Sequence, residues 1–198
     1  DPKTILYIVG LVKPKTKTVY DEFPIQMDGV RFKSNHLSVA RVKKGEFKTD
    51  TLRIYNDADI AKTITIPDHP EHMRFEFYPT KMMPKQKGEI IVHYDAAKKD
   101  DWGFVMDKVY LHFNGVKFEK NLLAISATIE ENFDNITAAE KLNSARMDFA
   151  EEAFNFGTIK KGEIINHSFT FKNTGKQTLH IRKMSSTCGC TASEPSAY

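Results

Sequence analysis

The fold is decided by a stretch of sequence that occurs twice. Residues 37–59 read LSVARVKKGEFKTDTLRIYNDAD, and residues 154–176 read FNFGTIKKGEIINHSFTFKNTGK. They align without a gap at an offset of 117 residues, from 37 to 154. Lys-Lys-Gly-Glu recurs in both stretches, and Asn56 falls on Asn173. Self-similarity at a fixed period indicates an array of similar domains.

The same offset relates a third fragment to the complete repeat. Residues 6–12, LYIVGLV, fall on residues 123–129, LAISATI. We therefore expect the chain to start on the last strand of one repeat and to stop partway into a third. The predicted boundaries are 1–13 for that last strand, 14–35 for a linker, 36–131 for a complete domain, 132–147 for a linker with a short helix, and 148–198 for the N-terminal part of a further domain.

Side chains alternate between apolar and polar within the complete repeat, which is typical of half-buried strands. Ile90, Val92 and Tyr94, for example, share one face of a predicted strand. The predicted strands are 37–42, 49–55, 61–66, 73–78, 88–94, 104–113 and 118–129.

Turn residues separate these strands, and Asn114-Gly115 between two apolar runs predicts a hairpin. Seven short strands with regular turns predict an all-β fold of tandem immunoglobulin-like β-sandwich domains. Trp102, the only tryptophan, is expected to anchor the core where a strand begins.

The two linkers are expected to differ. Thr137 and Glu140 fit a capping box, which predicts a short helix over 138–145. Pro14 and Pro24 predict that the first linker is extended.

Composition excludes several classes of protein. The formal net charge is +3, from 29 basic and 26 acidic residues that are interspersed along the chain, so no nucleic-acid footprint is present. No stretch approaches the ~20 apolar residues of a transmembrane helix. The chain begins Asp1-Pro2-Lys3 without a methionine, and we expect it to be a piece of a longer protein.

The most specific run lies in the third repeat. It contains Phe156-Gly157, Gly162-Glu163, Asn173-Thr174-Gly175 and the sequence STCGCT at 186–191. This run strongly resembles the bacterial domain-of-unknown-function family 1573, over 154–191. The resemblance implies an immunoglobulin-like fold of the Hydin and major sperm protein type. It also implies export by a Gram-negative bacterium to the periplasm or the outer-membrane and cell surface. No activity is established for that family.

Cys188 and Cys190 are the sharpest chemical feature. Two thiols on one strand face can hold Cu(I) or Zn(II), with His180 from the preceding strand as a third ligand. They can instead form a strained, reducible disulfide. As a further alternative, both are small, buried core residues around a tight turn at Gly189. All three interpretations stay open.

Other clusters carry weaker signals. His69 and His72 flank Pro70-Glu71 in a predicted loop, without the helical spacing of a His-Glu-x-x-His zinc site. No phosphate loop, nucleophile elbow or dinucleotide fingerprint occurs in the sequence. We therefore predict no catalytic residues, no cofactor and no enzymatic activity.

The leading prediction is a non-catalytic, secreted or cell-surface adhesion, scaffold or binding module whose partner is a protein or a polysaccharide. The alternative is a periplasmic metal- or thiol-handling protein acting through Cys188 and Cys190. The shared offset also predicts that strand 5–13 docks on the half-domain at 148–198, within one chain or in a strand-exchanged homodimer.

Overall fold

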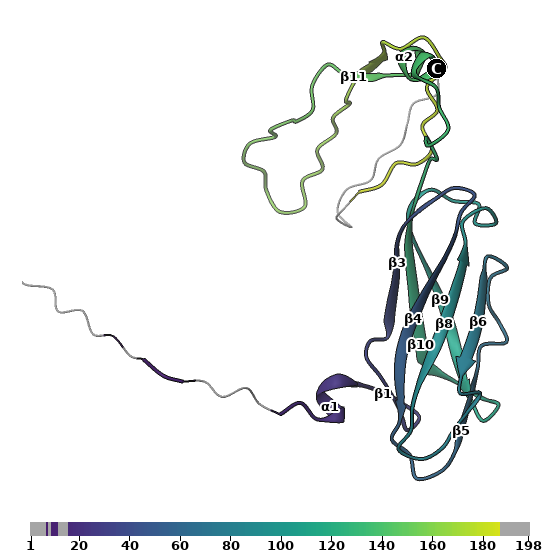
Figure 1. Cartoon of the computed structure of the whole chain (residues 1–198). Coiled ribbons are helices and arrows are strands. Elements are labelled where there is room, and N and C mark those ends of the chain that lie inside the picture. Colours follow the sequence, from purple (N-terminus) through teal and green to yellow (C-terminus); the bar gives the residue numbers. More distant parts are fainter. Residues whose placement is uncertain (1–6, 8, 12–15, 187–198) are drawn as a thin grey trace, which may run out of the picture. The chain divides into compact units, whose positions relative to one another are not determined.

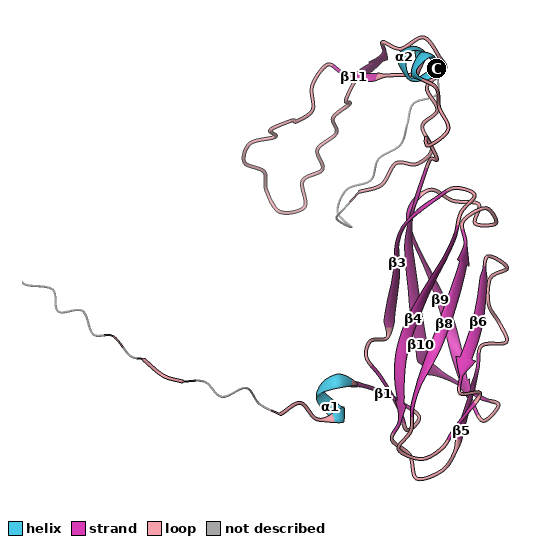
Figure 2. Ribbon diagram, in the orientation of Figure 1, coloured by secondary structure: helices cyan, strands magenta, loops and turns pink. Residues whose placement is uncertain are grey.

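The structure is a computed structural model that describes residues 7, 9–11 and 16–186 (Figures 1 and 2). The chain divides into a first unit, 1–130, and a second unit, 131–198. The elements of the first unit are α1 (Val19–Glu22), β1 (Ile25–Met27), β2 (Val30–Phe32), β3 (His36–Lys43), β4 (Phe47–Asn56), β5 (Lys62–Thr65), β6 (Met73–Tyr78), β7 (Lys81–Met82), β8 (Lys87–Asp95), β9 (Gly103–Phe113) and β10 (Val116–Glu130). Those of the second unit are α2 (Ala138–Asn143), β11 (Met147–Phe149) and β12 (Phe171–Asn173).

The first unit is a sandwich of two five-stranded sheets (Figure 2). One sheet has the order β1-β2-β4-β8-β6 and the other has the order β3-β10-β9-β5-β7. Buried side chains from both sheets form one core, in which the rings of Phe32 and Phe113 meet edge to face 6.4 Å apart. The predicted all-β, immunoglobulin-like β-sandwich is confirmed.

All seven strands predicted for the complete repeat are present, as β3, β4, β5, β6, β8, β9 and β10. Successive side chains of a strand point to opposite faces, so one set is buried and the other is not. In β8, Ile90, Val92 and Tyr94 are buried, whereas the intervening Ile91 and His93 are half-buried. The alternation seen in the sequence therefore decides which side chains form the core.

The hairpin predicted at Asn114-Gly115 joins β9 to β10. Both residues have positive φ, 49° and 82°, as a two-residue type I′ turn requires. Beyond the turn the pairing of β10 with β9 shifts between Lys117 and Leu122, so the intervening residues bulge out of the ladder. This bulge places Asn121 at the end of the sandwich.

The predicted linker 14–35 is wrong in its second half. Residues 25–32 form β1 and β2, and β2 pairs antiparallel with β4, so this segment belongs to the sandwich. Three-residue strands are too short to show a period, which is why the sequence pattern missed them. The first half is not wholly extended either, because α1 begins with a capping box between Thr18 and Asp21.

The helix predicted in the second linker is confirmed. α2 begins with the expected capping box of Thr137 and Glu140, and it ends two residues earlier than predicted because Ser144 leaves the helical conformation. Trp102 also lies where predicted. It directly precedes β9 and packs partly buried against the core, with Lys44 Nζ 5.4 Å from the centre of its ring.

The same set of hydrogen bonds occurs within each unit, between residues that are equivalent at the offset of 117. β11 pairs with β12 in the same register as β2 with β4, so Met147 lies opposite Asn173 as Val30 lies opposite Asn56. Each asparagine also fixes the loop that follows it. In the first unit Asn56 Nδ2 donates to Ile60 O (2.9 Å) and Ala58 N donates to Asn56 Oδ1 (3.1 Å). In the second unit Asn173 Nδ2 donates to Gln177 O (2.7 Å) and Gly175 N donates to Asn173 Oδ1 (3.0 Å).

A close backbone approach beside each asparagine requires a small residue. In the first unit Gly29 takes this place, and a Cβ added there would lie 3.0 Å from the Cβ of Ala58. In the second unit the small residue is on the other side of the contact, because Arg146 replaces the glycine and Gly175 replaces the alanine. A Cβ on Gly175 would lie 2.6 Å from Arg146 N. The exchange preserves the same approach in both units.

Apolar side chains that form the core of the first unit have exposed equivalents in the second. Phe156 is 56% exposed, whereas its equivalent Val39 is 1% exposed. Phe169 is 45% exposed, whereas Leu52 is 3% exposed. At the same offset, the positions that follow β12 as β8, β9 and β10 follow β4 fall beyond residue 198, so the described part of the second unit does not contain the strands that cover this face in the first unit.

Removing the buried asparagine should unfold the first unit at a lower urea concentration. Asn56→Ala leaves several buried carbonyl and amide groups without partners, at about 1–3 kcal/mol for each. We expect a loss of about 3 kcal/mol or more in the free energy of unfolding. The fluorescence of Trp102, the only tryptophan, follows this unit in a urea titration. The exposed Asn35→Ala serves as the matched control, and equal midpoints for both variants would contradict the role of Asn56.

Candidate functional site

The predicted metal ligands are not brought together in the part of the chain that the structure describes. Cys188 and Cys190 lie outside the described residues. His180 is exposed. The nearby Arg182 guanidinium lies 2.9 Å from Glu131 and, with a smaller contribution from His180, holds the pKa of Glu131 below its usual value. Among residues 7, 9–11 and 16–186, no three His, Cys, Asp or Glu side chains are grouped to hold a metal. The metal site therefore stays a prediction.

The two histidines of the 69–72 loop have separate partners. His72 is buried, and its Nε2 lies 2.9 Å from Asp107 Oδ2, while Lys99 Nζ lies 2.7 Å from the other oxygen of that carboxylate. His69 instead packs edge to face against Phe75. Because the Asp107 carboxylate bonds to both His72 and Lys99, this cluster ties β9 to the neighbouring loops, and we assign it a structural role.

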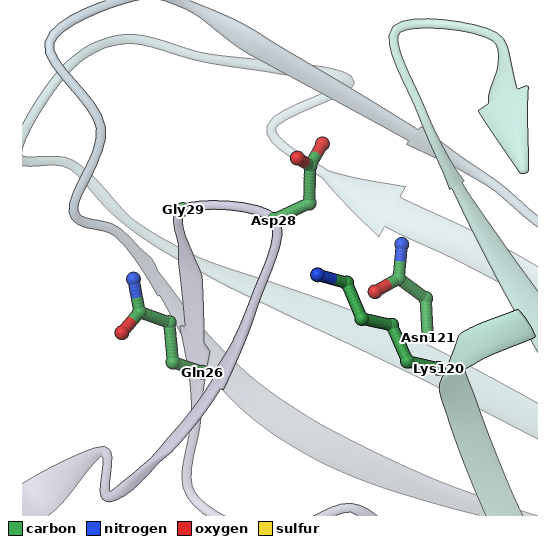
Figure 3. A pocket seen from close by; sticks show the side chains of 5 residues that line it. All are labelled: Gln26, Asp28, Gly29, Lys120 and Asn121. Carbon is green, nitrogen blue, oxygen red and sulfur yellow. The ribbon is translucent and has the colours of Figure 1, made fainter. Parts of the chain in front are cut away.

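A pocket at one end of the sandwich is the strongest candidate site (Figure 3). It has a volume of about 390 Å³ and lies between the β1–β2 turn and the bulge of β10. Figure 3 shows the side chains of Asp28, Lys120 and Asn121 gathered in the space between these two segments. The complete lining is Gln26, Asp28, Gly29, Lys120 and Asn121.

The turn side of the pocket is held rigidly. Asp28 and Gly29 both have positive φ, 48° and 81°, which makes a tight type I′ turn between β1 and β2. Lys62 Nζ, itself nearly buried, lies 3.0 Å from Asp28 Oδ2 and fixes the carboxylate. The carbonyl of Gly29 accepts a hydrogen bond of 2.9 Å from Asp57 N, next to the buried Asn56.

Asn121 is the unusual member of the pocket. Its side chain is fully buried, yet among the described residues neither Nδ2 nor Oδ1 has a hydrogen-bond partner. A buried amide group without partners costs about 1–3 kcal/mol for each unmet group. Most buried polar side-chain atoms are hydrogen-bonded to protein or to water, so an exception requires an explanation. Asn121 therefore lies in the wall of the pocket with an amide that is closed off from solvent.

One signal for this site was already present in the sequence, and the predictions above missed it. Asn121 has the same parity along β10 as Leu123, Ile125 and Ile129, all of which are buried. A polar residue at an inward position of a strand is a mark of a functional or fully hydrogen-bonded site. The β1–β2 side of the pocket had no such signal, because that hairpin was assigned to a linker.

An ion pair beside the pocket predicts a dependence of stability on pH. Arg31 Nε donates to Asp57 Oδ2 at 2.7 Å, which holds the pKa of Asp57 below its ordinary value of 3.8. A carboxyl group with a lowered folded pKa stabilises the fold above its unfolded pKa and loses this effect as the pH falls through the folded pKa. The contribution of Asp57 should therefore be complete well above pH 3.8 and should be lost progressively as the pH falls below that value.

Asp57→Asn should accordingly flatten the fall in the urea midpoint of unfolding as the pH is lowered through and below 3.8, measured by Trp102 fluorescence. The exposed Asp68→Asn is the matched control and should keep the slope of the unsubstituted chain. An unchanged slope for Asp57→Asn would show that the ion pair does not act on stability.

Comparison with known proteins relates the third repeat to a family. Residues 147–197 match the family described as a protein of unknown function (DUF1573), which confirms the resemblance seen over 154–191. No curated protein matches the sequence of the chain. No described helix is long and apolar enough to cross a membrane.

Several solved structures are similar to parts of the chain. A protein of unknown function from Porphyromonas gingivalis W83 is 12% identical with a TM-score of 0.47, over 61% of this chain and 55% of that one. This chain thus spans about half the length of that relative. The ASH/PapD-like domain 7 of human CEP192 is 12% identical with a TM-score of 0.38, over 65% of this chain and 99% of that domain.

The C. elegans major sperm protein family member WR4 is 12% identical with a TM-score of 0.33, over 52% of this chain and 100% of that one. These low identities and TM-scores support no functional assignment. The family pattern lies in the C-terminal quarter of the chain, and residues 147–197 are a match to DUF1573.

Proposed function

We propose that this chain is a non-catalytic binding and spacing module of a tandem immunoglobulin-like array, exported to the periplasm or cell surface of a Gram-negative bacterium. The observation that carries the proposal is the set of equivalent hydrogen bonds around Asn56 and Asn173. A repeated fold of this kind holds a fixed distance between surfaces and presents loops at its ends. The proposal of export rests on the family resemblance.

The linkers support the spacing role. A helix with a capping box, at Thr18–Glu22 and at Thr137–Asn143, precedes the equivalent strands β2 and β11 of the two units. A capping box satisfies two backbone amide donors at the start of a helix and so fixes where the helix begins. The same offset of 117 residues separates β2 from β11, so the lengths of chain between successive repeats match.

The binding role predicts a partner that is retained without being changed. The 198-residue chain is immobilised and presented with envelope polysaccharide and envelope protein from a Gram-negative bacterium in separate runs of biolayer interferometry. We expect one fraction to be retained and to keep its original size after elution, as measured by size-exclusion chromatography. Shortened material in the eluate would overturn the non-catalytic assignment, and retention of neither fraction would overturn the binding role.

The alternative function, metal or thiol handling through Cys188 and Cys190, rests on their close spacing and on His180. Native mass spectrometry after incubation with Cu(I) or Zn(II) separates the two functions. If the chain is a binding module, neither it nor the double variant Cys188→Ser, Cys190→Ser should carry bound metal, and their masses should differ only by the substitutions. Stoichiometric metal on the chain that is lost in the double variant would establish the alternative.

The same spectra report on assembly. The exposed apolar face of the second unit, which includes Phe149 and Phe171, supports the hypothesis that strand 5–13 covers it. Most of that strand lies outside the described residues, and the docking stays a prediction. A dimer favours exchange between two copies, whereas a monomer is compatible only with docking inside one chain or with no docking.

A further inference from the structure

We infer that a second pocket of the first unit, between the α1 segment and the outer face of the sheet that contains β4, binds a phosphate monoester. The inference deepens the proposed binding role, on which it rests for its setting at the cell envelope, by naming a site and a class of ligand. The pocket has a volume of about 560 Å³. Its lining includes four cations and two carboxylates, namely Lys17, Lys33, Arg53 and Lys87 with Asp21 and Glu22.

The α1 segment forms one wall of this pocket and is fixed on the sheet. Phe23, directly after α1, is 1% exposed, and its ring centre lies 6.0 Å from that of Tyr55 on β4. Glu22 Oε2 lies 2.6 Å from Lys87 Nζ on β8. These contacts hold the segment against the sheet, so Lys17, just before α1, lines the same pocket as the cations of the strands.

The cations of the sheet gather without a carboxylate partner. Arg53 lies between two buried residues of β4, and the alternation of side chains therefore places it on the outer face. Lys33 is its neighbour beyond β2, since Lys33 N donates to Arg53 O at 3.2 Å. In the described part of the chain no carboxylate forms an ion pair with Lys17, Lys33 or Arg53, although Glu89 lies opposite Arg53 on β8. Like charges repel one another, so this arrangement favours an anion between them.

The charge of the pocket matches a dianion. Glu22 is paired with Lys87, and the Asp21 carboxylate accepts from Thr18 N at 2.9 Å and from Thr18 Oγ1 at 2.7 Å. The six charged groups together leave a net charge of +2. A phosphate monoester carries a charge of about −1.5 to −2 at neutral pH, whereas a carboxylate or a phosphodiester carries a single charge. The Arg53 guanidinium also suits phosphate oxygens, which it can bind with two parallel hydrogen bonds.

The test follows the backbone amide signals of Lys33 and Arg53 in ¹H–¹⁵N spectra of the full 198-residue chain at low ionic strength. Methyl phosphate, a monoester, and dimethyl phosphate, a diester, are titrated separately. We expect saturable shifts with methyl phosphate and at least about fivefold weaker binding of dimethyl phosphate, because the diester has a single charge. Added sodium chloride should weaken both, since salt screens exposed charges. Equal affinities for the two esters would overturn the inference.

Variants separate the pocket from the general charge of the protein. Arg53→Met and Lys33→Met should each weaken methyl phosphate binding about twofold to fivefold, with an unchanged urea midpoint because both side chains are exposed. Lys108→Met, exposed on β9 of the other sheet, changes the net charge equally and should leave binding intact. An equal loss in Lys108→Met, or unchanged binding in the double variant Arg53→Met, Lys33→Met, would contradict the assignment of the site.

A phosphorylated sugar and a lipid headgroup can both present a phosphate monoester. Glucose 6-phosphate in the same titration tests the first source, and co-sedimentation with phosphatidylcholine vesicles that contain phosphatidic acid tests the second. A response to either that the double variant loses supports the inference, and a response to neither overturns it. Methyl phosphate binding by a chain that retains neither envelope fraction would leave the site standing and overturn the wider binding role. Retention of an envelope fraction without methyl phosphate binding would mean the reverse.

Discussion

The buried amide of Asn56 is the contact on which the end of the sandwich depends. Its Nδ2 lies within 2.9–3.1 Å of three carbonyl oxygens, on Ile60, Met82 and Met83. Leaving this buried amide unpaired would be costly, so the loop after β4 and the strand β7 are held in the geometry that pairs it. The same loop holds Asp57, which bonds to Gly29 and thereby sets the turn of the candidate pocket. Asn173 repeats the local part of this arrangement in the second unit, where its Nδ2 donates to Gln177 O and its Oδ1 accepts from Gly175 N.

The pocket follows from that constraint together with the bulge in β10. With the Asp28-Gly29 turn fixed from one side, the extra residues after Lys117 bring Lys120 and Asn121 opposite it. A strand bulge is a common way to redirect a side chain without disturbing the rest of a sheet. The remainder of β10 continues inward with Leu123 and Ile125, so the core tolerates one polar position at its edge.

Much of the fold could be predicted because period-2 alternation is a local property. Strands of four residues or more in the complete repeat show it, and the capping box at Thr137 identifies α2 in the same local way. The hairpin 25–32 could not be predicted from local alternation, because its position is set by the pairing of β2 with β4. The pocket depends on two segments about ninety residues apart that only the fold brings together, although the inward polar Asn121 was a usable signal.

That two repeats share one arrangement is tested most directly by native-state hydrogen exchange, residue by residue, in the 198-residue chain. Asp57 N donates to Gly29 O at 2.9 Å, and its equivalent Thr174 N donates to Arg146 O at 2.8 Å. We expect both amides to exchange at least about tenfold more slowly than an unstructured chain, with Asp57 the slower because its unit has a complete core. A protected Asp57 beside a Thr174 that exchanges at the unstructured rate would contradict the shared arrangement.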